Sequence, residues 1–295
     1  MLKSKWTKTK VLEFFIEKAI ILSGILSIVI VALIFLFLAK EGFAIFKTVS
    51  LKSILFGREW YPISEPPKFG ILPLILGSLL VTLGATVISV PLGIASAIYI
   101  SEVASPKIKE FLKSGVELLA AIPSVVIGFI GIMILVPFIK KIFHLPTGLT
   151  ALTGAIVLAF MAMPTIVSIA EDAITSVPKR YKEAALALGA THWQTIYRVI
   201  VPAAASGIVA SVMLGIGRVI GETMAVMMVT GNAARIPTSI VQPVRTLTAT
   251  IAAEMGETVQ GSSHYFALFT IGIVLFLITF VVNLVADYFL HRERR

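Results

Sequence analysis

The sequence predicts an all-α membrane protein with six transmembrane helices, and three observations support this fold class. First, 57% of the 295 residues are hydrophobic and only 14% are charged, with a mean hydropathy of +0.97. Soluble domains carry about 25% charged residues, so a chain this apolar has too few polar side chains to cover an aqueous surface. Second, the apolar runs reach about 20 residues, the length of a membrane-spanning helix. Third, the basic residues flank these runs.

Six apolar segments have the length of a spanning helix. We expect them at Ile16–Ala39, Gly70–Ile100, Gly115–Ile139, Leu149–Ala170, Ala203–Thr230 and Tyr265–Leu290. The second is too long to cross a bilayer about 30 Å thick in one straight helix, and Pro73 and Pro91 favour a kink. The first is longer than a signal-peptide core of about 7–15 residues, so we expect it to stay uncleaved. Residues 1–15 would then be a basic N-terminus, and residues 16–295 one six-helix transmembrane domain.

The distribution of basic residues predicts the orientation. An even number of spans puts both termini on one side, where 14 lysine and arginine residues lie against 9 on the other. Because positive residues stay inside, we expect both termini in the cytoplasm of a multi-pass protein of the cell inner membrane. The net charge of +9 follows from this topology and does not indicate nucleic-acid binding.

The predicted outer loops comprise residues 40–69, 140–148 and 231–264. Trp60 and Tyr61 in the first loop suit either an aromatic belt at the membrane interface or a docking face for an outer partner. In the last loop Thr246–Met255 is apolar and helix-compatible, so we expect a partly buried or re-entrant segment.

Two charged residues, Arg218 and Glu222, stand within the fifth predicted helix. A charge at the bilayer centre costs about 2.5–3.5 kcal/mol on insertion scales, so both need a physical reason. At a spacing of four they would share one helical face. They would form a structural ion pair, or Arg218 would line the route of an anion. A guanidinium has forked donors that fit phosphate-like oxyanions, and Glu222 would orient it and moderate the attraction so that the anion can leave.

Small residues recur every four positions along the same helix, in two rows. The rows are Gly207, Ser211 and Gly215, and Gly217, Gly221 and Ala225. Such rows let helices approach closely in lipid, and tight packing is a sufficient reason for them. We therefore expect the face with Arg218 and Glu222 to lie against another helix or a central passage.

A polar, helix-forming segment, residues 176–202, separates the fourth and fifth predicted helices. Ser176 is expected to cap a helix with Pro178 in its first turn. Gly189 is expected to end that helix, and Pro202 to stop the next one near the membrane. The spacing suits either an amphipathic helix on the membrane surface or a projecting helix on which another protein pushes.

This segment resembles the EAA loop of ABC-importer permeases, whose pattern is E-A-A, three residues, G, nine residues and I-x-L-P. The chain matches it at Glu183-Ala184-Ala185, Gly189 and Pro202, and departs from it at Val199 and Val201. In that family the loop forms the coupling helix, which sits in a cleft of the ATPase subunit. The resemblance assigns ATPase coupling to the residues Glu183, Ala184, Ala185 and Gly189.

The resemblance covers nearly the whole chain and is most specific for phosphate-transport permeases of PstC type. The motifs that carry it are Gly217-Arg218-Val219-Ile220-Gly221-Glu222-Thr223-Met224-Ala225-Val226, Gly231-Asn232, Glu117–Ser124 and Arg245-Thr246-Leu247-Thr248. It implies a type I ABC-importer permease (MetI-like) bundle with a cytoplasmic coupling helix, and it puts Arg218, Glu222 and Thr223 on the phosphate passage. The implied partners are a sister permease of PstA type, two ATPase subunits of PstB type and an outer phosphate-binding protein of PstS type.

The sequence predicts no catalytic site of its own. It has no G-x-x-x-x-G-K-[ST] phosphate loop and no cysteine, and His144, His192 and His264 are too dispersed to form a metal site. We expect a non-catalytic subunit that binds no cofactor, with ATP and magnesium held by the ATPase partners. Two alternatives stay open: a permease for another oxyanion such as molybdate or sulfate, and an ATP-independent ion channel or proton-coupled carrier.

Overall fold

The computed structural model describes residues 8–292, and most of them are helical. Five helices are long and apolar enough to cross a membrane, and the bent pair 192–203 and 205–221 makes a sixth if counted as one span. The predicted all-α membrane fold with six transmembrane helices is confirmed in this form.

The elements follow one another in a simple order along the chain. They are α1 (Lys8–Gly42), the 3-10 helix η1 (Phe43–Lys47), α2 (Leu51–Phe56), β1 (Trp60–Tyr61), β2 (Lys68–Phe69), α3 (Leu72–Ile98), the π-helix η2 (Tyr99–Val103), α4 (Pro106–Ala121), α5 (Ser124–Ile130), the π-helix η3 (Gly131–Leu135), α6 (Val136–Ile142), α7 (Ala151–Thr175), α8 (Lys179–Ala187), α9 (His192–Thr195), the π-helix η4 (Ile196–Ile200), α10 (Val201–Ala203), α11 (Ala205–Gly221), α12 (Met224–Val229), α13 (Leu247–Glu254), the 3-10 helix η5 (Met255–Glu257) and α14 (Ser263–Arg292).

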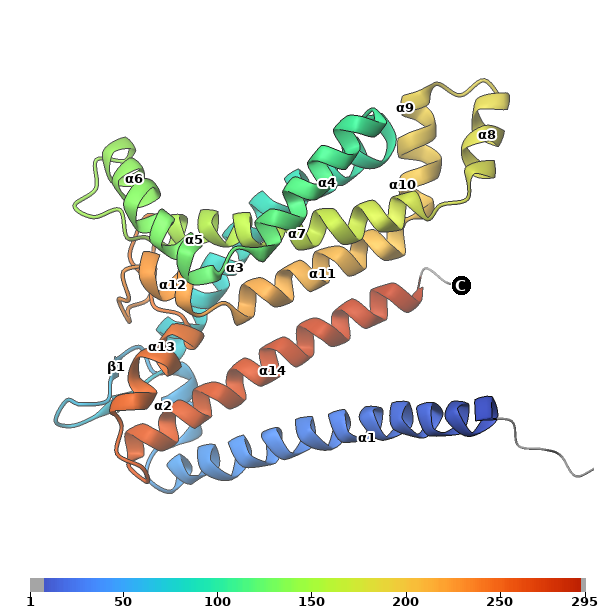
Figure 1. Cartoon of the computed structure of the whole chain (residues 1–295). Helices are drawn as coiled ribbons and strands as arrows, with labels where there is room; N and C mark the ends of the chain where they lie inside the picture. The colour runs from blue at the N-terminus through green and yellow to red at the C-terminus, as the bar shows by residue number, and fades with distance from the viewer. Residues whose placement is uncertain (1–7, 293–295) are drawn as a thin grey trace, which may run out of the picture.

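The long helices run between two ends of the molecule. The start of α1, the end of α14 and the helices α8 and α9 lie at one end, which we call the α8 end (Figure 1). The two-stranded antiparallel sheet of β1 and β2, with α2 and α13, lies at the opposite, α13 end. Both described ends of the chain therefore lie on one side, as an even number of crossings requires.

The core of the bundle is formed by α3, α7, α11 and α12. Glycines set the close approach of α3 to α7: a Cβ on Gly84 would lie 2.8 Å from Ala155 Cβ, and one on Gly93 would lie 2.8 Å from Ile166 Cγ2. Without side chains at these two positions the helices pack at short range, so α3 and α7 form a tight pair through the centre of the molecule.

The predicted third helix, Gly115–Ile139, is wrong as a single element. The chain forms α4, leaves the helix at Ile122, and resumes as α5, η3 and α6, so that the spanning part is Ser124–Ile142. Pro123 is the reason, because it disfavours helical backbone in the preceding residue, and Ile122 has ψ 126°. The α4 helix packs alongside α7 instead of continuing the span.

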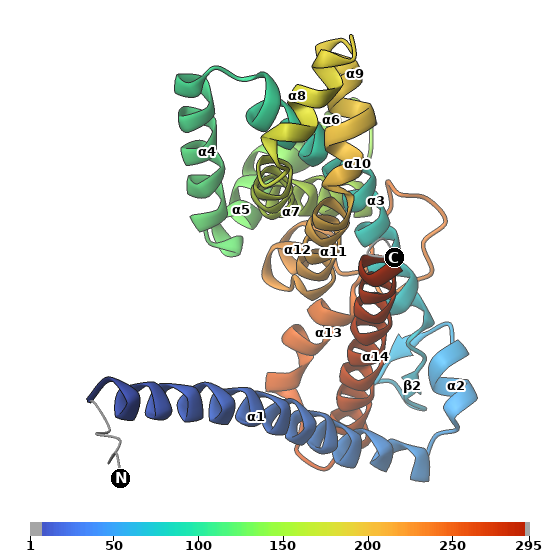
Figure 2. The same cartoon turned by 90° about the vertical axis from the view of Figure 1, so that its right-hand side faces the viewer.

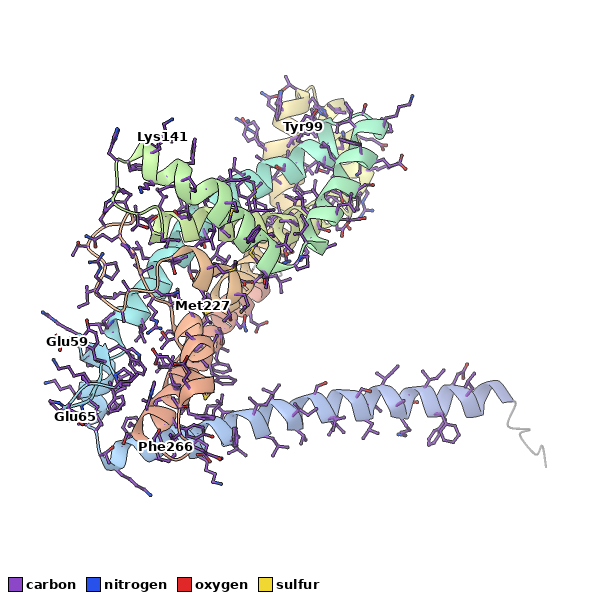
Figure 3. All side chains as sticks on the ribbon, turned by 60° about the vertical axis from the view of Figure 1, so that its left-hand side comes forward. Glu59, Glu65, Tyr99, Lys141, Met227 and Phe266 are labelled. Atoms are coloured by element: carbon purple, nitrogen blue, oxygen red, sulfur yellow. The ribbon has the colours of Figure 1, made fainter. Side chains whose placement is uncertain are left out.

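Within the described residues, the contacts between α1 and the rest of the chain lie near the C-terminal end of this helix. Near its C-terminus Thr270 Oγ1 of α14 donates to the Gly42 carbonyl oxygen at 2.8 Å, and the Phe37 and Phe269 rings meet edge to face. The remainder of α1 diverges from the bundle (Figures 2 and 3). Its apolar side chains, almost all exposed within this single chain, need lipid or another protein to cover them.

Candidate transport site and EAA segment

The fifth predicted span is broken beside its charged residues. The α11 helix ends at Gly221, Glu222 has extended backbone (φ −69°, ψ 132°), and α12 begins at Met224. The prediction that Arg218 and Glu222 share the face of one helix is therefore wrong.

Two hydrogen bonds fix the backbone of the break. The Glu222 carboxylate accepts from the Ala225 backbone N–H at 3.1 Å, within the first turn of α12. The Thr248 hydroxyl of α13 donates to the Glu222 carbonyl oxygen at 2.9 Å. In a continuous helix, backbone polar groups bond to one another along the helix. At the break, these two bonds satisfy the Ala225 N–H and the Glu222 carbonyl oxygen instead.

The Arg218 side chain forms a hydrogen bond to a residue of α7 and not to a carboxylate. Its Nη1 donates to Thr165 Oγ1 at 3.1 Å, and this is its one hydrogen bond within residues 8–292. No ion pair joins it to Glu222 in that range, so the structural ion pair does not form here. A guanidinium has five N–H donors, and those not used by Thr165 remain for a ligand or a partner subunit.

The first row of small residues lies on α11, whereas the second runs from Gly217 and Gly221 of α11 to Ala225, which is buried in α12. A Cβ on Gly207 would lie 2.3 Å from Ala173 Cβ, and one on Gly215 would lie 2.6 Å from Ile166, so this row packs against α7. In contrast, a Cβ on Gly217 or Gly221 would meet nothing within 4 Å. The expected tight packing is confirmed for the first row and for Ala225, whose Cα would lie 3.0 Å from a Cβ on Gly128. The face of α11 with Gly217, Arg218 and Gly221 is open within this single chain.

Thr223 lies at the same break. Its hydroxyl donates to the Gly221 carbonyl oxygen at 3.2 Å, and it is the residue before α12. The structure thus brings Thr223 and Glu222 to one non-helical turn, about one helical turn beyond Arg218 in sequence. Sequence reasoning gave neither Thr165 nor Thr248 a role at the site. The only signal of Thr165 was a hydroxyl in an apolar helix, whereas Thr248 stands in the motif Arg245-Thr246-Leu247-Thr248, which carried the resemblance.

The EAA segment, residues 176–202, forms a helix, a turn and a second helix. Gly189 ends the first helix as predicted, with φ +84° in the region that favours glycine. The prediction for Ser176 is wrong: it ends α7, and its hydroxyl donates to the Asp172 carbonyl oxygen, while Pro178 precedes α8. Pro202 does not stop the second helix, which bends by 70° into α11 after Ala203.

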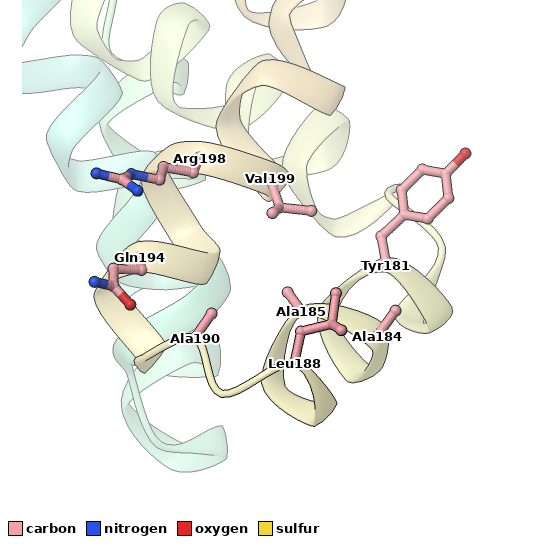
Figure 4. Close-up of a pocket in the computed structure, with 8 residues that line it drawn as sticks. All are labelled: Tyr181, Ala184, Ala185, Leu188, Ala190, Gln194, Arg198 and Val199. Carbon is pink, nitrogen blue, oxygen red and sulfur yellow. The ribbon is translucent and has the colours of Figure 1, made fainter.

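The surface of the EAA segment carries exposed apolar side chains. Leu188 is 89% exposed, Glu183 and Ala184 are exposed, and Ala185 is buried. A cavity of about 430 Å³ lies between α8 and the helix that follows, with Leu188 and Ala184 on one wall and Val199 on the other (Figure 4). Exposed apolar groups of this kind mark a surface for contact with another protein or with the membrane.

A charged cluster at the α13 end was not expected from the sequence. The Glu254 carboxylate accepts from Trp60 Nε1 at 3.1 Å and from Arg245 Nη1 at 2.5 Å, and lies 2.8 Å from His264 Nε2. Trp60 is only 2% exposed, so this residue belongs to the core, whereas Tyr61 beside it is exposed. The predicted helix in the last loop is confirmed as α13, whose first half is buried.

A second unexpected cluster joins α4 to α7. The almost fully buried carboxylate of Glu171 forms two ion pairs. Its Oε1 lies 2.7 Å from Lys109 Nζ, and its Oε2 lies 2.8 Å from Lys113 Nζ. The hydrogen bond to Glu171, with a second to Asp172, raises the pKa of Lys113 above its ordinary value. Because α4 has no buried residue of its own, this cluster is the main polar attachment of α4.

Comparisons with known proteins place these features in a family. A family model described as "Binding-protein-dependent transport system inner membrane component" matches residues 89–295, more than half of the chain. The probable ABC transporter permease protein YqgH of Bacillus subtilis (strain 168) is 42% identical, over 88% of this chain and 84% of its own length. The phosphate transport system permease protein PstC of Mesorhizobium japonicum is 39% identical, over 81% of this chain and 78% of its own length.

Solved structures agree on the fold. A chain of the bacterial ABC transporter involved in the import of alginate has a TM-score of 0.65 and 18% identity, with 96% of this chain and 99% of that chain covered. A chain of the MetNI methionine ABC transporter has a TM-score of 0.60 and 18% identity, with 79% and 100% covered. The match to the family model and the relatives that are 39–42% identical show that this multi-pass membrane protein belongs to the family of binding-protein-dependent transport system inner membrane components.

Proposed function

We propose that this chain is the transmembrane permease subunit of an ATP-driven phosphate importer and forms the phosphate passage with a sister permease. The observation that carries the proposal is the guanidinium of Arg218 on the open face of α11, beside a helix break, with one hydrogen bond and no ion pair within residues 8–292. Relatives named as phosphate permeases, 34–39% identical over most of the chain, support phosphate as the substrate.

Arg218, Glu222 and Thr223 would act together on the passing anion. The guanidinium attracts the phosphate, and its remaining forked donors fit two phosphate oxygens at once. The Glu222 carboxylate limits that attraction, so the anion is not trapped. Because a phosphate that keeps one proton can donate a hydrogen bond to a carboxylate, and sulfate cannot, Glu222 also favours phosphate.

In this proposal the α8 end faces the cytoplasm and both termini lie there. Glu183, Ala184, Ala185 and Gly189 form the coupling helix and its end, and exposed Leu188 enters the ATPase subunit. The α13 end, with a cavity of about 1070 Å³ lined by Trp60, Arg245 and Glu254, faces the outer binding protein.

The complete transporter would contain this chain, a sister permease of PstA type, two ATPase subunits of PstB type and a binding protein of PstS type. ATP and magnesium would be held by the ATPase subunits, which leaves this chain a non-catalytic role. Residues 1–15 would be a cytoplasmic N-terminus and residues 16–295 the permease domain. Lipid or the sister permease would cover the exposed sides of α1.

The test is uptake of radiolabelled phosphate into vesicles that contain the chain with its three kinds of partner, with and without ATP. ATP-dependent uptake that excess molybdate or sulfate leaves unchanged supports the phosphate importer. Inhibition by either competitor indicates a permease for another oxyanion. Uptake without ATP indicates a channel or carrier and contradicts the proposal.

A further inference from the structure

One ion pair links the EAA segment directly to a spanning helix. Lys182 Nζ in α8 lies 2.6 Å from Glu102 Oε2, in the π-helical end of α3. The Glu102 side chain is 11% exposed and that of Lys182 is 36% exposed. Lys182 stands three residues before buried Ala185, so it lies on the face of α8 that is turned toward the bundle.

Packing between α8 and the spanning helices is otherwise loose. A cavity of about 430 Å³ separates α8 from the ends of α3 and α7, and both Lys182 and Glu102 line it. The neighbours on which α8 packs most are α9 and η4, which belong to its own segment. The ion pair is therefore a specific contact across a space that apolar side chains do not fill.

The α3 helix extends from this ion pair to the helix break beside Arg218. Its span, Leu72–Val103, has 32 residues and a length of about 48 Å at 1.5 Å per residue. Near its other end, Ser78 Oγ accepts from the Leu247 backbone N–H at 2.9 Å, at the start of α13. The next residue, Thr248, donates to the carbonyl oxygen of Glu222 at the break.

The helix pair α3 and α7 also reaches Arg218 directly. Because α3 and α7 pack closely at Gly84 and Gly93, a displacement of α3 moves α7 with it. The α7 helix carries Thr165, which holds the guanidinium of Arg218. Both routes from α3 thus end at the residues proposed to contact the anion.

We propose that the Lys182–Glu102 ion pair transmits the displacement of α8 to α3, and that these two side chains are positioning residues for coupling ATP hydrolysis to transport. This inference rests on the proposed function, in which α8 is the coupling helix. The second helix of the segment packs on α3 and α7 through apolar side chains, with Ile196 and Ile200 of η4 in one buried cluster with Ala97 and Ile174. The ion pair is the polar contact that fixes α8 itself to the end of α3, so its loss weakens the link between ATP hydrolysis and the passage.

The test compares Lys182→Glu, Glu102→Lys and the double exchange in the complete reconstituted transporter. The measured quantity is the number of phosphate ions imported per ATP hydrolysed, with the amount of ATPase subunit retained in the purified complex as a second readout. Lys179→Glu is the matched control, because Lys179 is an exposed lysine of the same helix. We expect each single variant to lower the ratio by about ten-fold while the ATPase subunits stay bound, and the double exchange to restore most of it.

Three outcomes would overturn the inference: a normal ratio in both single variants, a double exchange that restores nothing, or ATPase subunits lost from the single variants but not from the control. The last would make the pair a docking element. The substrate assignment is judged separately on the unmodified transporter. If that transporter imports sulfate or molybdate in place of phosphate, the proposed substrate is wrong, and the same ratio measured with that oxyanion still tests the ion pair.

Discussion

Replacement of Arg218 by glutamine is the sharpest perturbation of the proposed passage. The variant keeps a planar, hydrogen-bonding group on a shorter side chain and removes the positive charge. Because the guanidinium has no carboxylate partner within residues 8–292, its charge is available to an anion rather than neutralised within the chain. We expect phosphate uptake to fall sharply while the complex stays assembled.

The size of the effect follows from the charge. Two unit charges 4 Å apart interact by about 4 kcal/mol at an effective dielectric constant of 20. Since about 1.4 kcal/mol corresponds to a factor of ten, kcat/KM for uptake should fall by about a thousand-fold. Arg218→Lys keeps the charge and loses the forked geometry, so we expect a smaller loss of about ten-fold.

The assay is ATP-dependent uptake of radiolabelled phosphate over a range of concentrations, with subunit content checked after purification. Arg58→Gln is the matched control, because Arg58 is an exposed arginine with no ion pair in the described part of the chain. Uptake by Arg218→Gln close to that of the control, in an intact complex, would refute the reasoning. Loss of the complex in Arg218→Gln alone would show that Arg218 is structural.

Three further predictions rest on contacts described above. Thr165→Val should lower kcat/KM for uptake by about five-fold, because Arg218 loses its one described hydrogen bond, whereas Thr165→Ser should transport normally; equal rates would contradict this. Gly189 has φ +84°, so Gly189→Val should destabilise the end of α8 by about 1–2 kcal/mol and lower the phosphate transported per ATP hydrolysed. Gly189→Asn should be tolerated, because asparagine adopts this backbone conformation more readily. A valine variant with normal transport per ATP would contradict this prediction. Glu171→Gln should destabilise the protein by about 2 kcal/mol, read as a lower melting temperature in detergent, since Lys109 and Lys113 lose the carboxylate that attaches α4; an unchanged melting temperature would count against it.

Two of the helix ends found in the structure had local signals in the sequence. Pro123 ends α4 and Gly221 ends α11, and both residue types disfavour the interior of a helix. The predicted spans nevertheless ran through both, because an apolar run continues across each break. Hydropathy measures the preference of a segment for lipid, which a short break hardly changes, and so it does not locate helix ends.

The sequence by itself determined the number of spanning segments, the position of the EAA segment and the presence of two charged residues where lipid is expected. These are properties of local composition and spacing, which a single chain displays directly. Only the tertiary structure decided that Arg218 is held by Thr165, 53 residues away, and Lys182 by Glu102, 80 residues away. A single hydrogen bond or ion pair between distant residues has no period and no composition of its own, so it exists as a pattern only once the helices have packed.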